Sequence, residues 1–166
     1  MSKKLTWIEK LETIIPGFSG YKKRELARED DRLIRNYIVK TLTDAKIKIE
    51  EAAATVIEFN YETAKRLNNL ASTINYIADK VKFAESGYAP HYNIVKVELN
   101  TLEKLKEIDN NLVGSAKKVK EMASEIAKIS AVTKVPSKKL TQIIEELGKI
   151  EQILEERLKV LRGWSQ

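Results

Sequence analysis

The chain has 166 residues, of which 43% are hydrophobic and 33% are charged, and it contains no cysteine. This balance excludes a disordered chain and a membrane-embedded one, and the missing cysteines exclude disulfides and thiolate chemistry. We expect one domain over residues 1–166, located in the cytoplasm because the N-terminal lysines precede no long apolar run. Heavy use of lysine and glutamate, with scarce cysteine and methionine, would suit a hot environment.

The net charge of +6 is concentrated near the start of the chain. Residues 1–40 carry ten basic and six acidic side chains. A basic end of this kind permits contact with nucleic acid or with an anionic membrane surface, without requiring either.

The first predicted element is a short helix over about residues 5–14. Leu5, Ile8, Leu11 and Ile15 mark one face of it. Pro16-Gly17 ends the helix, because proline blocks continuation and glycine takes the turn. A loop over residues 16–21 follows.

No proline or glycine interrupts the chain from Tyr21 to Ser86. Over this run, apolar residues recur in steps of three and four, which predicts helices with a coiled-coil seam. One helix of that length would span roughly 95 Å, so we predict helices over about 22–59 and 61–84 that fold back at Asn60, a residue that tolerates a left-handed cap. The seam comprises Ile38, Leu42, Ala45, Ile49, Ala52, Val56 and Phe59, then Ala64, Leu67, Ala71, Ile74, Ala78 and Val81.

Two more helices follow, over about 93–130 and 137–162, after loops that contain Gly87 with Pro90 and Pro136. Asp109 falls at a seam position, where a polar residue sets helix register or oligomeric state, or else lies against solvent at a hinge or beside a loop. Ser137 is a suitable N-cap for the last helix. The seam residues are Leu102, Leu105, Leu112, Ala116, Val119, Ala123 and Ile126, then Leu140, Ile144, Leu147, Leu154, Leu158 and Leu161.

The predicted fold class is all-α, an elongated antiparallel bundle of four to five helices built from coiled-coil hairpins. Neighbouring helices joined by short loops run antiparallel. The loops at 16–21 and 86–92 should therefore lie at one end of the bundle, and the breaks near 60 and at 132–136 at the other.

The sequence contains no recognisable catalytic or metal-binding motif. His91 is the single histidine, so the Glu-x-x-His pairs of a di-iron bundle and a Cys/His zinc site are both missing. There is also no Gly-x-x-x-x-Gly-Lys phosphate loop and no dinucleotide fingerprint. We therefore expect no enzyme, no cofactor, no metal and no small-molecule substrate.

A basic segment over residues 22–35 is the first candidate site. Lys22, Lys23 and Arg24 would oppose the dipole at a helix start, unless an anion binds there or the exposed cluster is simply tolerated. An arginine stripe at Arg24, Arg28, Arg32 and Arg35 would face away from the core, because Leu26, Leu33 and Tyr37 fall nearly opposite it on the helix. It either tracks phosphates or, because Asp31 lies in the same arc, forms a salt-bridged solvated face.

Aromatic residues in the two loops form the second candidate site. They would make a stacking surface for single-stranded RNA or a flexible peptide, or else plug the end of the bundle. The residues concerned are Phe18 and Tyr21 in one loop, with Tyr88, His91 and Tyr92 in the other.

The segment Pro16-Gly17-Phe18-Ser19-Gly20-Tyr21-Lys22, continued by Arg24-Glu25-Leu26 and Arg28-Glu29-Asp30-Asp31-Arg32-Leu33, resembles the opening of uncharacterised helical proteins found in prokaryotes. In these, a Pro-Gly-aromatic-x-Gly-Tyr-Lys turn leads into an Arg/Glu-rich helix. The resemblance extends to the Gly87-Tyr88-Ala89 turn and Val95-Lys96-Val97. It implies no activity and no site, only that the two loops matter together.

These observations favour a non-enzymatic helical scaffold or adaptor that acts through contacts with a protein partner or with itself. The alternative is a phosphate-binding module for RNA, the ribosome or an anionic membrane surface, which would use the basic segment.

Overall fold

The computed structural model describes residues 6–19, 27–84 and 99–161 of the chain. These residues form helices and turns, as the sequence predicts, and the described parts contain no strand. The helices are α1 (Trp7–Ile14), α2 (Ala27–Val56), α3 (Tyr61–Lys82), α4 (Leu99–Ser130) and α5 (Ser137–Leu161).

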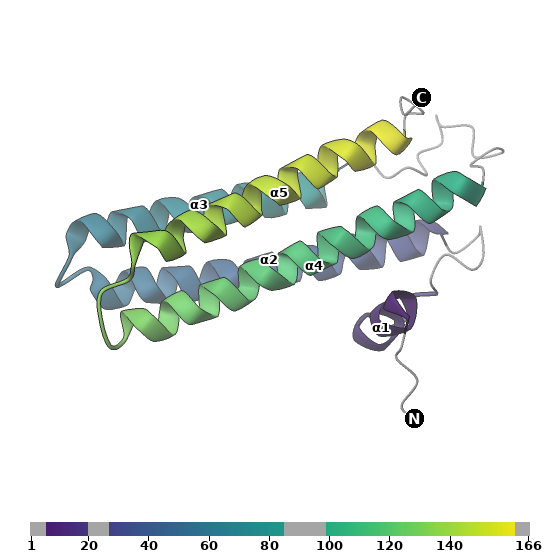
Figure 1. Ribbon diagram of the computed structural model, residues 1–166. Helices are drawn as coiled ribbons and strands as arrows, with labels where there is room; N and C mark the ends of the chain where they lie inside the picture. Colours follow the sequence, from purple (N-terminus) through teal and green to yellow (C-terminus); the bar gives the residue numbers. More distant parts are fainter. Residues whose placement is uncertain (1–5, 20–26, 85–98, 162–166) are drawn as a thin grey trace.

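The four long helices form a bundle of two antiparallel hairpins, α2 with α3 and α4 with α5, in which the neighbouring helices α2 and α4 run parallel (Figure 1). Helix α2 packs against α3 and α4, and α5 packs against α4 and α3, so α2 and α5 face each other diagonally across the core. The turns at 57–60 and 131–136 lie together at one end, and α1 lies at the opposite end. The predicted arrangement of the described turns is confirmed, whereas the loop at 86–92 lies outside the described residues.

The break near Asn60 is confirmed, but its local geometry differs from the prediction. Helix α2 already ends at Val56, and Asn60 is the N-cap of α3, with an extended φ of −151° instead of a left-handed one. Its side-chain oxygen accepts a hydrogen bond from the backbone N–H of Thr63 at 3.0 Å. Phe59 is 86% exposed because it lies in this turn, so its assignment to the seam was wrong.

The predicted seam residues of α2, α3 and the described part of α4 are all buried in the core, apart from Phe59, so these seams are confirmed. In α5 the predicted phase is wrong by one residue at two positions: Ile143 is fully buried where Ile144 is 54% exposed, and Arg157 is buried where Leu158 is only half-buried. The observed seam steps through Leu140, Ile143, Leu147 and Ile150, a regular alternation of three and four residues. Continued by the same steps, it passes through Leu154 and Arg157.

Helix α1 is held against the bundle by apolar side chains. A capping box between Thr6 and Glu9 starts the helix, and Leu11, Ile15 and Phe18 are buried in the main core. The turn after α1 needs the positive φ of Gly17, +83°, which a side chain would strain. Phe18 therefore fits the interpretation that the loop aromatics plug the end of the bundle.

Surface ion pairs connect neighbouring helices at three places. They are Lys120 with Asp44 at 2.9 Å, Lys139 with Glu125 at 2.6 Å and Lys80 with Glu151 at 2.6 Å. The hydrogen bond to Glu151 raises the pKa of Lys80, with a smaller contribution from Tyr76. Exposed pairs of this kind contribute little to stability. None of the described helices combines the length and the apolar character needed to cross a bilayer.

The phase of α5 can be checked with two neighbouring isoleucines. We expect Ile143→Ala to lower the free energy of unfolding by about 2–5 kcal/mol, because it opens a cavity in the core. Ile144→Ala should change it by less than about 0.5 kcal/mol, since that side chain faces solvent. Urea denaturation followed by circular dichroism measures both values. Equal costs would contradict the observed phase.

Candidate functional site

Charged side chains from three helices meet inside the bundle, towards the end where α1 lies. Asp31 of α2, Asp109 of α4 and Arg157 of α5 are each at most 4% exposed. The Arg157 Nε–H donates to a carboxylate oxygen of Asp109 at 2.9 Å, and its Nη2 donates to Asp31. One guanidinium thus bridges two acids that belong to different helices, across the diagonal between α5 and α2.

Arg35 of α2 extends this ionic cluster to the fourth long helix. Its Nη2 lies 2.9 Å from the second carboxylate oxygen of Asp31. Its Nη1 donates to the backbone carbonyls of Ala84 at 3.0 Å and Lys82 at 3.3 Å, which are free acceptors at the C-terminus of α3. The ionic cluster (Asp31, Arg35, Asp109 and Arg157) is formally neutral and contacts all four long helices.

Asp30, next to Asp31, secures the connection between α1 and α2. Its fully buried carboxylate accepts hydrogen bonds from the backbone N–H of Ser19 at 2.8 Å and from the hydroxyl of Ser19 at 2.5 Å. Two adjacent acids therefore face different partners, one in the incoming loop and one in the core. This fixes where α1 lies relative to the bundle.

A buried ion cluster is an arrangement for specificity more than for stability. Desolvating four charged groups costs free energy that their attraction offsets only when every partner is in place. Here each acid of the cluster has an arginine partner. Sliding any one helix by a turn would leave a charge buried without its partner, so the cluster selects one register.

Sequence reasoning identified Asp109 as a polar seam residue and missed Arg157. The available signal was the heptad phase of α5, in which Arg157 follows Ile150 and Leu154 at seam spacing. The predicted seam contained Ile144 instead of Ile143, and in that phase Arg157 does not fall at a seam position. The structure shows that Asp109 is buried and paired with Arg157, so it does not face solvent, and this fits a role in helix register.

The arginine stripe is not a single solvated face. Arg32 is exposed and pairs with Glu29, and their hydrogen bond raises the pKa of Arg32 and lowers that of Glu29. Arg35 points inward to Asp31, so the prediction that all four arginines face away from the core was wrong. The prediction took Leu33 and Tyr37 as the core direction, whereas both are only half-buried and line a groove beside α1.

The structure does not describe the side chains of the other predicted site residues. Arg28 belongs to α2. The remaining ones lie outside the described residues: Tyr21, Lys22, Lys23, Arg24, Tyr88, His91 and Tyr92.

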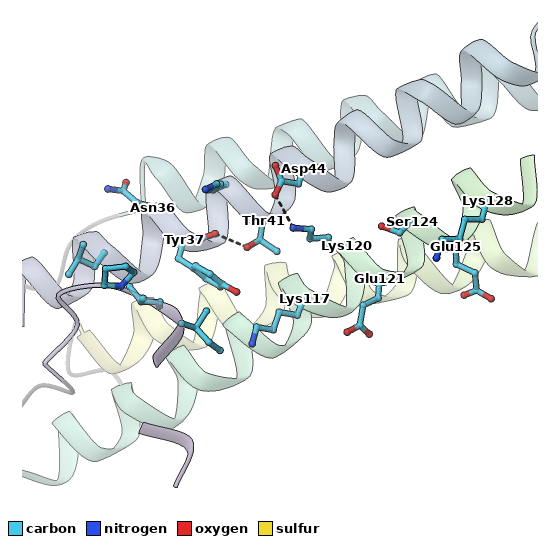
Figure 2. Close-up of a pocket in the computed structure, with 15 residues that line it drawn as sticks. Asn36, Tyr37, Thr41, Asp44, Lys117, Lys120, Glu121, Ser124, Glu125 and Lys128 are labelled. Atoms are coloured by element: carbon cyan, nitrogen blue, oxygen red, sulfur yellow. Dashed lines mark hydrogen bonds and ion pairs between the residues drawn. The ribbon is translucent and has the colours of Figure 1, made fainter. Parts of the chain in front are cut away.

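A long open groove runs between α2 and α4 (Figure 2). Its volume is about 990 Å³, and Ile14, Ile15 and Pro16 from the end of α1 close one end of it. Short or hydroxylated side chains along it, Thr41 and Ser124, leave the space open. The Thr41 hydroxyl donates to the Tyr37 carbonyl at 2.8 Å and is therefore already satisfied.

Lysines dominate the charge of the groove. Among the described residues, Lys40, Lys117 and Lys128 have no ion-pair partner, whereas Asp44 and Glu125 are both engaged by lysines. Glu121 is the one groove carboxylate left without such a pair in this part of the chain. The groove therefore presents a net positive surface.

No protein-family model matches the chain, and no curated protein or solved structure shows significant similarity to it. Within the described residues, no group of three or more acidic, histidine or cysteine side chains is placed to hold a metal ion.

The ionic cluster makes a specific prediction for stability. Arg157→Leu leaves Asp109 buried without its guanidinium and should lower the free energy of unfolding by about 3–5 kcal/mol. Adding Asp109→Leu removes the stranded charge and keeps the pair of Asp31 with Arg35, so the double variant should recover most of the loss. Urea denaturation at pH 7 measures all three proteins.

Arg32→Leu is the matched control, since it breaks an exposed pair and should cost less than about 1 kcal/mol. An Arg157→Leu variant no less stable than Arg32→Leu would show that the cluster makes no contribution.

Proposed function

We propose that the protein is a non-enzymatic adaptor, and that it binds a helical segment of a partner protein in the groove between α2 and α4. The observation that carries this proposal is the position of α1. This short helix already packs across one end of the same groove through Ile14 and Ile15. The rest of the groove continues along the two long helices with no segment of the described chain covering it (Figure 2).

The lining of the groove suits an amphipathic helix. Leu33 and Tyr37, both half-buried, provide apolar surface near α1, and Ser124 and Thr41 are small enough to let a helix approach. Helices that dock in grooves present apolar anchors spaced by three and four residues. The existing packing of α1, with Leu11 and Ile15 buried four residues apart, is one example of this mode.

The charge of the groove indicates an acidic partner. Lys40, Lys117 and Lys128 line both walls and have no carboxylate partner among the described residues. Acidic residues flanking the apolar face of a bound helix would pair with them, and the pairing would steer association. We therefore propose an amphipathic helix with acidic flanks as the occupant.

The alternative function, a phosphate-binding module built on the basic segment, draws less support from the described residues. Arg35 is committed to Asp31 and to carbonyls of α3, and Arg32 pairs with Glu29. That alternative then depends on Lys22, Lys23, Arg24 and Arg28, whose side chains the structure does not describe. It predicts binding to RNA that weakens steeply with salt and is abolished when these four residues are replaced by glutamate.

Cross-linking from inside the groove, followed by blocking the groove with a tryptophan, tests the adaptor proposal. A photo-crosslinking amino acid at position 124 should capture an acidic helical protein in cells, whereas the same amino acid at Ser72, exposed on α3, should not. Ser124→Trp should then abolish co-purification of that captured protein, and Ser72→Trp should leave it unchanged. Circular dichroism confirms that both tryptophan variants remain folded.

Three outcomes would contradict the proposal: no capture at position 124, equal capture at both positions, or unchanged co-purification after Ser124→Trp. A cross-link to a second copy of the chain would make the occupant the protein itself. That would replace the acidic partner with self-association.

A further inference from the structure

The end of the bundle opposite α1 carries an unusual group of exposed apolar side chains. Val132 is 87% exposed, Phe59 86%, Tyr61 71% and Ile57 48%. The first three rank among the most exposed large hydrophobic side chains in the described chain, and all four belong to the two neighbouring turns at 57–60 and 131–136 or their edges. Together we call them the apolar tip.

The two turns lie side by side at this end of the bundle, which brings Phe59 and Val132 together. Phe59 and Val132 line the same hollow of about 410 Å³, which lies between the turns. A hydrogen bond of 3.4 Å from Arg66 to the Ser137 hydroxyl connects the starts of α3 and α5 just above them. In Figure 1 both turns project beyond the helices at the end farthest from α1.

Basic side chains surround the apolar tip. Residues 57–66 and 131–138 contain four cations, Lys65, Arg66, Lys134 and Lys138, against two carboxylates, Glu58 and Glu62. All six are exposed, and none has an ion-pair partner among the described residues. Lys65 lies about 8 Å and Arg66 about 9 Å from the turn along α3, at 1.5 Å per residue, which is about one Debye length at physiological salt.

This combination fits an anionic bilayer surface better than a protein surface. Four side chains at the end of a bundle offer at most several hundred Å², short of the roughly 800 Å² per partner in a stable protein interface. Two copies meeting tip to tip would bring like charges together. A bilayer needs no shape complementarity: its interface accepts aromatic and aliphatic side chains, while its anionic headgroups attract lysine and arginine.

We propose that the apolar tip inserts Phe59, Tyr61 and Val132 into the interface of an anionic lipid bilayer, with the surrounding cations on the headgroups. The contact is peripheral and reversible, and the bundle contacts the membrane through this end. Helix α1 then stays clear of the lipid, because it lies at the opposite end of the bundle. The proposed contact uses other residues than the proposed adaptor function and is independent of it.

Vesicle binding tests the proposal on the full chain. The protein should co-sediment with vesicles of equal parts phosphatidylglycerol and phosphatidylcholine, but not with phosphatidylcholine alone, and binding should weaken as salt rises. Phe59→Ser combined with Val132→Ser should reduce the partition coefficient roughly tenfold or more, because two apolar side chains lose their transfer into the interface. Both sites are exposed, so the fold should tolerate the changes.

Phe83 provides the matched control. It is 75% exposed but lies at the C-cap of α3, at the other end of the bundle, so Phe83→Ser should bind like the wild type. The natural chain has no cysteine, which allows a single polarity-sensitive dye at Val132→Cys or at Phe83→Cys. On anionic vesicles the dye at 132 should shift to shorter emission wavelength, and the dye at 83 should not.

Several results would overturn the proposal. They are no binding to anionic vesicles at low salt, binding unchanged in the Phe59/Val132 variant, and equal shifts of the dye at 132 and 83. Loss of vesicle binding only when Lys22, Lys23 and Arg24 become glutamate would place the membrane contact at the opposite end. Capture of a protein partner by the apolar tip without vesicle binding would replace the lipid with a protein.

Discussion

The neutral ionic cluster of Asp31, Arg35, Asp109 and Arg157 is the interaction on which the arrangement of the four long helices depends. Elsewhere the seam consists of alanine, valine, leucine and isoleucine, which would pack acceptably in more than one register. Charged groups do not tolerate such shifts, because a buried charge without its partner is strongly unfavourable. Arg157 connects helices that lie diagonally, so a single side chain specifies both register and neighbour order.

The position of the ionic cluster also explains how the two ends of the bundle differ. At the end near α1, α2, α4 and α5 are tied through side chains, and α3 is tied through the carbonyls of Lys82 and Ala84. At the other end, two short turns and the Asn60 cap hold the helices, and apolar side chains are left in solvent. One end is therefore organised internally, while the other is available for an external contact.

Much of the fold could be predicted because apolar spacing and chain breaks depend on local sequence. The seams of α2, α3 and α4, the turn at Asn60 and the start of α5 at Ser137 follow from such patterns. The ionic cluster could be predicted only in part. Asp109 stood out as polar at a seam position, but a long-range pair with Arg157, 48 residues away, leaves no local pattern in one sequence.

The direction of Arg35 and the exposure of Phe59 could not be predicted for a related reason. A helical wheel gives relative angles, but the direction of the core depends on which neighbours pack on each side. Leu33 and Tyr37 face α1 and the groove instead of the bundle centre, which displaced the inferred core direction. Phe59 continues the spacing of the seam, but it lies three residues beyond Val56, where α2 ends. Its exposure therefore depends on where the turn begins.

The buried guanidinium can be observed directly by NMR. In a protein labelled with ¹⁵N arginine, the Hε of Arg157, assigned by its loss in Arg157→Lys, should exchange with solvent far more slowly than the Hε of the exposed Arg66. It should also show a nuclear Overhauser contact to the Asp109 side chain, since its Nε–H donates to that carboxylate at 2.9 Å. An Arg157 Hε that exchanges as fast as that of Arg66 would contradict the central claim that these helices are registered by a buried ionic cluster.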